Sequence, residues 1–289
     1  MSKKLVISVA GGGALGIGPL AFLCKIEQML GKKIPQVAQA YAGTSTGAII
    51  AAGLAEGYSA HELFDLYKSN LSKIFTKYSW YKRLQPTCPT YDNSNLKKLL
   101  KDKFKGKVGD WKTPVYIPAT HMNGQSVEKV WDLGDKNVDK WFAILTSTAA
   151  PTYFDCIYDD EKNCYIDGGM WCNAPIDVLN AGLIKSGWSN YKVLDLETGM
   201  DTPNTESGNK TLLGWGEYII SNWVARSSKS GEYEVKAIIG EDNVCVARPY
   251  VSKKPKMDDV DSKTLDEVVD IWENYFYAKQ KDIASWLKI

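Results

Sequence analysis

The first fifty-five residues alternate between apolar runs and glycine-rich turns. Residues 4–10 are mostly apolar and partly β-branched, which predicts a buried strand that enters a tight turn. A largely buried helix is expected from Gly18 to Gly31. The same order follows, with an apolar approach over 37–42, a sharp turn and a helical stretch over 48–54. Strand and helix alternating in this way predict parallel α/β construction.

Two later helices carry sequence signals for their first turns. Ser59 and Glu62 have the spacing of a capping box and predict that a helix begins there. Thr264 and Glu267 repeat this spacing, and the apolar residues after them recur at helical intervals. We therefore expect an amphipathic C-terminal helix over about 264–288 that packs on the body of the protein through its apolar stripe.

The middle of the chain extends the α/β pattern. Segments 113–118 and 191–196 have the composition of further strands. The segment 200–211 is polar and rich in turn-forming residues, so we expect a surface loop there. We find no internal repeat and no low-complexity tract.

Composition restricts the classes of function. Of 289 residues, 44% are hydrophobic and 24% are charged, which is typical of a globular protein and excludes disorder, collagen and a coiled coil. Thirty-five Lys and Arg against 34 Asp and Glu leave a net charge of +1, so no global field favours binding to nucleic acid. Six Cys without a C-x-x-C pair argue against a disulfide scaffold, and two His argue against a His-rich metal site.

Two uncharged stretches superficially resemble membrane segments. Residues 5–24 are interrupted by five glycines, which suits a strand and a loop better than a signal peptide. Residues 34–55 carry Gln, Thr and Ser that make this stretch too polar for a lipid-facing helix. A soluble, cytoplasmic chain is therefore expected.

The second strand-to-helix turn carries a candidate nucleophile. Gly43-Thr44-Ser45-Thr46-Gly47 matches the pattern G-x-S-x-G between an apolar strand and a helix. A strained turn at such a junction raises a serine hydroxyl above the edge of the sheet, and flanking glycines leave room for it. Ser45 is therefore the candidate nucleophile.

A serine hydroxyl needs a base to take its proton, and neither histidine is a convincing one. His61 is expected in the first turn of its helix as a solvated residue, and His121 as a structural residue whose hydrogen bonds are satisfied. Asp167 ends an apolar approach and precedes Gly168 and Gly169, so it supplies a carboxylate instead. With its usual pKa of about 3.9 an Asp is a feeble base. Burial in an apolar cleft would raise that pKa towards a useful value.

Three consecutive glycines, Gly11, Gly12 and Gly13, precede the first helix. Their N–H groups at a helix N-terminus can stabilise the oxyanion that forms when serine attacks a carbonyl. With Gly16 they also spell G-x-G-x-x-G, a dinucleotide fingerprint that expects an acidic residue about 20 positions further on. No Asp or Glu occurs over 28–55, so acyl transfer is preferred to nucleotide binding.

Together these motifs resemble the patatin-like phospholipases. The glycine-rich loop, Gly-Thr-Ser-Thr-Gly and Asp-Gly-Gly occur in the family's order at comparable separations, and the resemblance spans roughly residues 4–200. Segments 146–154 and 167–175 are also similar to the family's sequence around its catalytic aspartate. The resemblance implies a three-layer α/β/α fold with a mostly parallel central sheet and a single catalytic domain over 1–289. It also implies a Ser-Asp dyad that works without a cofactor or a required metal.

Residue by residue, the resemblance makes Ser45 the nucleophile and Asp167 the base. The oxyanion hole that it implies consists of Gly11, Gly12 and Gly13. The supporting glycines of its motifs are Gly16, Gly43, Gly47, Gly168 and Gly169.

Three positions depart from the family's pattern. Ala10 stands where an acidic residue is frequent, and Ala48 where another glycine is common. Leu15 replaces the usual Arg or Lys near the end of the glycine loop. This last change removes a basic contact for an anion and makes that wall more apolar, but it leaves the backbone donors in place.

Positive charge is concentrated in one segment. Residues 66–107 carry eleven Lys or Arg and two Asp, a net charge of +9, so the rest of the chain carries −8. Within it, cations and aromatic residues are mixed in a way that suits the headgroup region of an anionic bilayer. These possible membrane contacts are Lys77, Trp80, Tyr81, Lys82 and Arg83. The alternative is a solvated helix over 96–107 and a packed aromatic loop.

We therefore expect a lipid acyl hydrolase of the phospholipase A type that forms an acyl-enzyme. Its substrate would be a phospholipid or another acyl lipid, and its partner a membrane surface that it meets transiently. A catalytically silent relative that binds membranes or partners is the first alternative, and a nucleotide-binding oxidoreductase is a less favoured one. No nucleic-acid partner is expected, and the oligomeric state stays open.

Overall fold

The computed structural model describes residues 3–85, 87–124, 127–199, 211, 229–251 and 255–288. The surface loop predicted over 200–211 lies outside this part of the chain, except for Thr211. The strands are β1 (Lys4–Val9), β2 (Ala38–Gly43), β3 (Val115–His121), β4 (Glu128–Trp131), β5 (Ile157–Tyr158), β6 (Cys164–Asp167), β7 (Tyr191–Leu196) and β8 (Val244–Ala247). The α-helices are α1 (Ile17–Leu30), α2 (Thr46–Glu56), α3 (Ala60–Ile74), α4 (Ser94–Lys103), α5 (Lys140–Ser147), α6 (Ile176–Lys185) and α8 (Ser262–Leu287). A further helical segment covers 229–239.

Most of the central sheet is parallel. β1 lies between β2 and β7, β2 pairs with β3, and β7 pairs with β8, all in parallel. β4 and β6 pair with β3, and β5 with β6, in antiparallel orientation. The order across the described sheet is β5-β6-β3-β2-β1-β7-β8, with β4 attached to β3. The segments predicted as strands over 113–118 and 191–196 correspond to β3 and β7.

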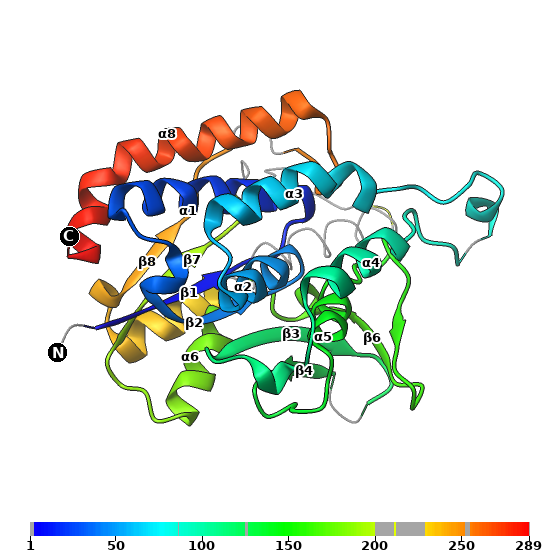
Figure 1. The fold of residues 1–289 in the computed structure, drawn as a ribbon, viewed down its shortest axis with the longest axis horizontal. Helices are drawn as coiled ribbons and strands as arrows, with labels where there is room; N and C mark the ends of the chain where they lie inside the picture. The colour runs from blue at the N-terminus through cyan, green and yellow to red at the C-terminus, as the bar shows by residue number, and fades with distance from the viewer. Residues whose placement is uncertain are drawn as a thin grey trace.

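Helices cover both faces of the sheet and produce three layers (Figure 1). α1, α3 and α8 lie on one side, and α6 lies on the other. Side chains of β1 alternate accordingly, because successive residues of a strand face opposite ways. Ile7 and Val9 join the apolar cluster of α1 and α8, whereas Val6 joins the cluster of α6. The expected α/β/α fold with a mostly parallel sheet is confirmed.

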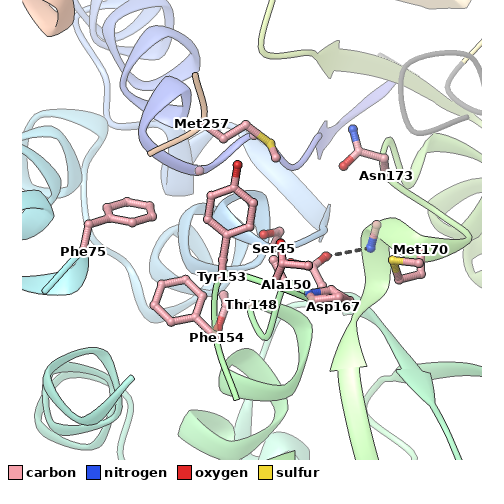
Figure 2. Close-up of a pocket in the computed structure, with 15 residues that line it drawn as sticks. Ser45, Phe75, Thr148, Ala150, Tyr153, Phe154, Asp167, Met170, Asn173 and Met257 are labelled. Carbon is pink, nitrogen blue, oxygen red and sulfur yellow. Dashed lines mark hydrogen bonds between the residues drawn. The ribbon is translucent and has the colours of Figure 1, made fainter. Parts of the chain in front are cut away.

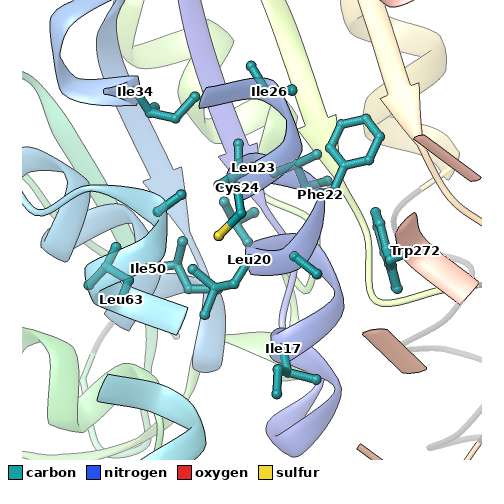
Figure 3. Packing of buried hydrophobic residues seen from close by; sticks show 14 of the residues in the cluster. Ile17, Leu20, Phe22, Leu23, Cys24, Ile26, Ile34, Ile50, Leu63 and Trp272 are labelled. Atoms are coloured by element: carbon teal, nitrogen blue, oxygen red, sulfur yellow. The ribbon is translucent and has the colours of Figure 1, made fainter. Parts of the chain in front are cut away.

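The largest apolar cluster joins α1 to α8 (Figure 3). Phe22 of α1 meets Trp272 and Phe276 of α8 edge to face, with ring centroids 5.8 and 5.6 Å apart. Trp272 also lies directly on α1, where a Cβ on Gly18 would come within 2.1 Å of the indole Nε1. Helix α8 therefore buries the apolar stripe of its sequence against α1.

The start of α8 corrects one prediction from the sequence. Its N-cap is Asp261 rather than Thr264, because the Asp261 carboxylate accepts hydrogen bonds from the N–H groups of Lys263 and Thr264 at 3.1 and 3.2 Å. Free N–H groups of a first turn prefer such an acceptor, which leaves Thr264 inside the helix.

The capping box predicted at the start of α3 is confirmed. There the Ser59 hydroxyl accepts from the Glu62 N–H at 3.1 Å, and the Glu62 carboxylate accepts from the Ser59 N–H at 2.7 Å.

Replacing Trp272 with Ala should lower the free energy of unfolding by about 3–5 kcal/mol, because it leaves a cavity between α1 and α8. Tyr277 is on the same helix but is 55% exposed, so Tyr277→Ala should cost about 1 kcal/mol or less. Urea denaturation followed by circular dichroism measures both changes. Equal losses in the two variants would contradict the docking of α8 on α1.

Candidate active site

The predicted site lies where three neighbouring parallel strands end. Val9, at the end of β1, pairs with Gly43 of β2 on one side and with Leu196 of β7 on the other. The glycine loop after β1, the turn after β2 and the segment 197–199 after β7 therefore begin side by side. Ligand sites of open α/β sheets form at this edge.

Ser45 occupies a strained turn between β2 and α2. Its backbone has φ 55° and ψ −123°, which a residue with a Cβ rarely adopts. The chain is packed tightly around it: a Cβ on Gly43 would lie 2.0 Å from the Gly47 carbonyl oxygen, and one on Gly47 would lie 2.1 Å from the Val9 oxygen. The Ser45 N–H donates to Ser147 Oγ at 3.0 Å. These contacts hold Ser45 at the start of α2, on the wall of a pocket.

Asp167 ends β6 and lies next to Ser45 in the same pocket (Figure 2). Its side chain is 5% exposed, and its carboxylate accepts a hydrogen bond from the Gly169 N–H at 2.7 Å. Burial raises the pKa of Asp167 to about 6, although hydrogen bonds from the Ser45 hydroxyl and the Gly169 N–H act in the opposite direction. A carboxylate with this pKa is ionised at neutral pH and is a better proton acceptor than an ordinary Asp.

The glycine loop contributes Gly12 and Gly13 to the lining of the pocket. The Gly11 N–H already donates to the Asn173 carbonyl oxygen at 3.0 Å. Over the described ranges, the N–H groups of Gly12 and Gly13 donate to no protein acceptor, and both residues line the pocket. Of the three glycines from which an oxyanion hole is expected, Gly11 therefore has its N–H engaged, whereas the N–H groups of Gly12 and Gly13 have no acceptor in the described part of the chain.

The pocket around these residues is mainly apolar and has a volume of about 180 Å³. Its apolar wall includes Phe75, Ala150, Pro151, Phe154, Met170 and Met257 (Figure 2). Among the lining residues that the structure describes there is no Lys, Arg or His. A smaller cavity continues from Ser45 towards Ile49 and Leu71. The site can therefore hold an extended apolar group beside the Ser45 hydroxyl.

Other predicted residues lie around the site. Gly168 and Gly169 follow Asp167 in a short 3₁₀ turn, and Gly16 lies where the glycine loop enters α1. The possible membrane contacts lie outside the pocket, on the loop between α3 and α4. There Trp80 and Tyr81 are 71% and 59% exposed, so the packed aromatic loop considered as an alternative is not found.

Neither histidine lines the pocket. His61 begins α3, and its Nδ1 lies 3.1 Å from the Glu27 carboxylate, so it is paired as well as solvated. His121 ends β3 and stacks on Tyr165, with ring centroids 4.8 Å apart. Its Nε2 is buried and has no hydrogen-bond partner among the residues that the structure describes. In this part of the chain the hydrogen bond expected for that nitrogen is not found, whereas the stacking on Tyr165 is.

Three residues of the site were not assigned a role from the sequence. Ser147 receives the Ser45 N–H, Thr198 Oγ1 donates to the Gly11 carbonyl oxygen at 3.1 Å, and Met257 reaches the pocket from the segment before α8. Ser147 and Thr198 lie in segments whose similarity to the family is visible in the sequence. Met257 lies in the less similar last third of the chain, where no local pattern signals it.

Comparison with known proteins agrees with this geometry. The family model described as patatin-like phospholipase matches residues 7–180. A cGAMP-activated phospholipase of Pseudomonas aeruginosa is 33% identical over 182 residues, which are 59% of this chain and 54% of that protein. A cGAMP-activated phospholipase of Vibrio cholerae is 30% identical over 252 residues, which are 73% of this chain and 70% of that protein. An intracellular phospholipase A2 of Caenorhabditis elegans is 31% identical over 194 residues, 62% of this chain and 17% of that protein.

The chain thus spans about half the length of the Pseudomonas relative and a small part of the nematode one. The crystal structure of VipD from Legionella pneumophila matches with a TM-score of 0.50 and 14% identity, over 95% of this chain and 67% of that one, which is a likeness of fold. The family model covers more than half of the chain and includes both Ser45 and Asp167. On this match, the chain belongs to the patatin-like phospholipase family.

Proposed function

We propose that this protein is a lipid acyl hydrolase of the phospholipase A type, with Ser45 as nucleophile and Asp167 as base. One observation carries the proposal: the two side chains meet in an apolar pocket beside two unengaged backbone N–H groups. The phospholipase names of the relatives support the same reaction. Family membership gives no support to the nucleotide-binding alternative.

The reaction follows from the geometry. Ser45 Oγ attacks the acyl carbonyl carbon while Asp167 takes the hydroxyl proton, and the carbonyl electron pair moves onto the oxygen. The N–H groups of Gly12 and Gly13 stabilise that oxyanion. When the tetrahedral intermediate collapses, the leaving alcohol of the lysolipid takes the proton from Asp167. Water then attacks the acyl-enzyme by the same route and releases a free fatty acid.

Two variants test the catalytic pair. Ser45→Ala removes the nucleophile and Asp167→Asn removes the base, so each should lower fatty-acid release by about 10³-fold or more. The substrate is a mixture of phospholipids, and mass spectrometry measures the released acid. Ser69→Ala and Asp160→Asn are matched controls, because both residues are exposed and outside the pocket, and both should keep full activity.

Undiminished release by either site variant would overturn the assignment. A wild-type protein that releases no fatty acid and is not labelled at Ser45 by a fluorophosphonate would instead support the catalytically silent alternative.

The pH dependence of the rate tests the base separately. Because Asp167 accepts a proton only when ionised, kcat/KM should fall on acidification with a midpoint near its pKa of about 6 and should level off above it. The profile is measured from about pH 4 to about pH 8 with a short-chain neutral ester. Asp160→Asn should leave the midpoint unchanged. A midpoint near 4, the ordinary pKa of Asp, would show that burial does not raise the pKa of Asp167.

The loop between α3 and α4 supports a peripheral membrane surface next to the pocket. Figure 1 shows this loop projecting beyond the body of the molecule. Trp80, Tyr81 and Leu84 are exposed on it, beside Lys82 and Arg83. Within the described ranges, no helix combines the length and the hydropathy that crossing a bilayer requires. Exposed aromatic rings with adjacent cations are suited to the interface of an anionic bilayer.

The base of the same loop is attached to the pocket wall. The N–H groups of Thr90 and Tyr91 donate to the carbonyl oxygens of Thr152 and Tyr153 at 2.9 and 2.8 Å. Thr152 and Tyr153 both line the pocket. A bilayer held by the loop would therefore lie close to the entrance through which a lipid reaches Ser45. Transient association with a membrane is part of the proposed function.

Vesicle flotation tests this surface. The double variant Trp80→Ala, Tyr81→Ala should bind anionic vesicles about tenfold more weakly, and Lys82→Gln with Arg83→Gln should lose a similar factor. Tyr233→Ala is the control, because Tyr233 is exposed on the helical segment 229–239. Equal binding of the wild type to anionic and zwitterionic vesicles would contradict the electrostatic contribution.

A further inference from the structure

The peptide between Gly11 and Gly12 is fixed through its carbonyl oxygen, by Thr198, which does not line the pocket, and by Asn173, which does. Its carbonyl oxygen accepts hydrogen bonds from Thr198 Oγ1 at 3.1 Å and from Asn173 Nδ2 at 3.5 Å. In a planar trans peptide the C=O and the N–H point in opposite directions. The Gly12 N–H therefore points away from Thr198, which does not line the pocket, whereas Gly12 does.

The direction of the second N–H donor of the glycine loop, that of Gly13, is fixed in a different way. The carbonyl oxygen between Gly12 and Gly13 accepts from the Leu15 N–H at 3.2 Å, within the short 3₁₀ turn that precedes α1. The backbone alone orients the Gly13 N–H. The direction of the Gly12 N–H depends instead on side chains that hold the Gly11 carbonyl. The shorter of these bonds comes from Thr198, in the segment after β7 and 187 residues from Gly11, and the longer one from Asn173.

Thr198 can orient the peptide between Gly11 and Gly12 because the position of Thr198 is itself fixed. It is buried and follows β7 directly after Glu197, whose N–H donates to the Ala247 carbonyl oxygen at 3.1 Å. The Glu197 carboxylate accepts a hydrogen bond from Arg248 Nε at 2.5 Å. The Thr198 side chain also packs against the glycine loop, since a Cβ on Gly12 would lie 2.5 Å from both Thr198 Oγ1 and Cγ2.

We propose that Thr198 is a positioning residue for the oxyanion hole. Its hydroxyl acts through the Gly11 carbonyl and aims the Gly12 N–H at the oxygen that becomes charged when Ser45 attacks. This role rests on the proposed function. An N–H that points at the developing oxyanion makes a stronger hydrogen bond in the transition state than in the bound substrate. Loss of its alignment should therefore lower kcat rather than raise KM.

The test compares Thr198→Val with Thr198→Ser. Val keeps the shape that packs on Gly12 but cannot donate a hydrogen bond, so kcat for ester hydrolysis should fall about tenfold while KM stays within about twofold. Ser keeps the hydroxyl and should restore most of the rate. A long-chain trifluoromethyl ketone, which forms an oxyanion adduct with Ser45, should bind Thr198→Val more weakly by the same factor. The pH midpoint should not move, because Asp167 is untouched.

The matched control is Tyr191→Phe. It removes another buried hydroxyl, which donates to Asn180 from the first residue of β7, and it should lower thermal stability without changing kcat. If Thr198→Val does not fold, Thr198→Ala replaces it in the comparison with Thr198→Ser.

Each outcome decides the role of Thr198. Unchanged kcat in the variant that lacks the hydroxyl would overturn the positioning role. A loss that Ser does not restore, or that Tyr191→Phe shares, would assign Thr198 a packing role and also overturn it. An inactive wild type would overturn the proposed function together with this role, whereas an active wild type with an equally active Thr198→Val would overturn this role alone.

Discussion

The rest of the site depends on one close contact between two backbones. Gly47 of α2 lies directly against the Val9 carbonyl of β1. No side chain fits between them, since a Cβ on Gly47 would lie 2.1 Å from the Val9 oxygen. This contact brings the start of α2 down onto the end of the sheet, and Ser45 is forced into its positive φ. Strain of this kind persists only where the surroundings determine it, here through the glycines and the hydrogen bond that the Ser45 N–H donates to Ser147 Oγ.

The apolar lining of the pocket has two effects at once. It can hold an apolar group, and it removes water from Asp167, which raises the pKa of that carboxyl group to about 6. Cations would undo the second effect, because they favour the ionised form, and the described lining has none. Leu15, which was expected to make this wall more apolar, is buried in the cluster of α1 and α8 and does not line the pocket. The apolar character of the pocket and the raised pKa of Asp167 thus have one physical source.

The sequence predicted those features of the fold and site that depend on local patterns. Strand and helix alternation indicated the parallel sheet, and G-x-S-x-G and Asp-Gly-Gly in their apolar contexts indicated Ser45 and Asp167. What it missed depends on contacts between distant segments. The Gly11 N–H is engaged by Asn173, the Gly11 carbonyl by Thr198, and neither partner can be found from spacing. The N-cap of α8 is Asp261 rather than Thr264, and the capping-box spacing from which Thr264 was predicted does not reveal this acceptor.

The segment before α8 joins parts of the molecule that the chain otherwise keeps apart. The Met257 carbonyl oxygen accepts from the Ala14 N–H at 2.7 Å, while the Met257 side chain contributes to the pocket wall. A few residues later the chain enters α8, which is clamped on α1 by Trp272. The packing of α8 on α1 is therefore linked to the shape of the pocket. Any process that separates α8 from the body of the protein would also draw Met257 out of the pocket wall and leave the Ala14 N–H, beside the glycine loop, without its acceptor.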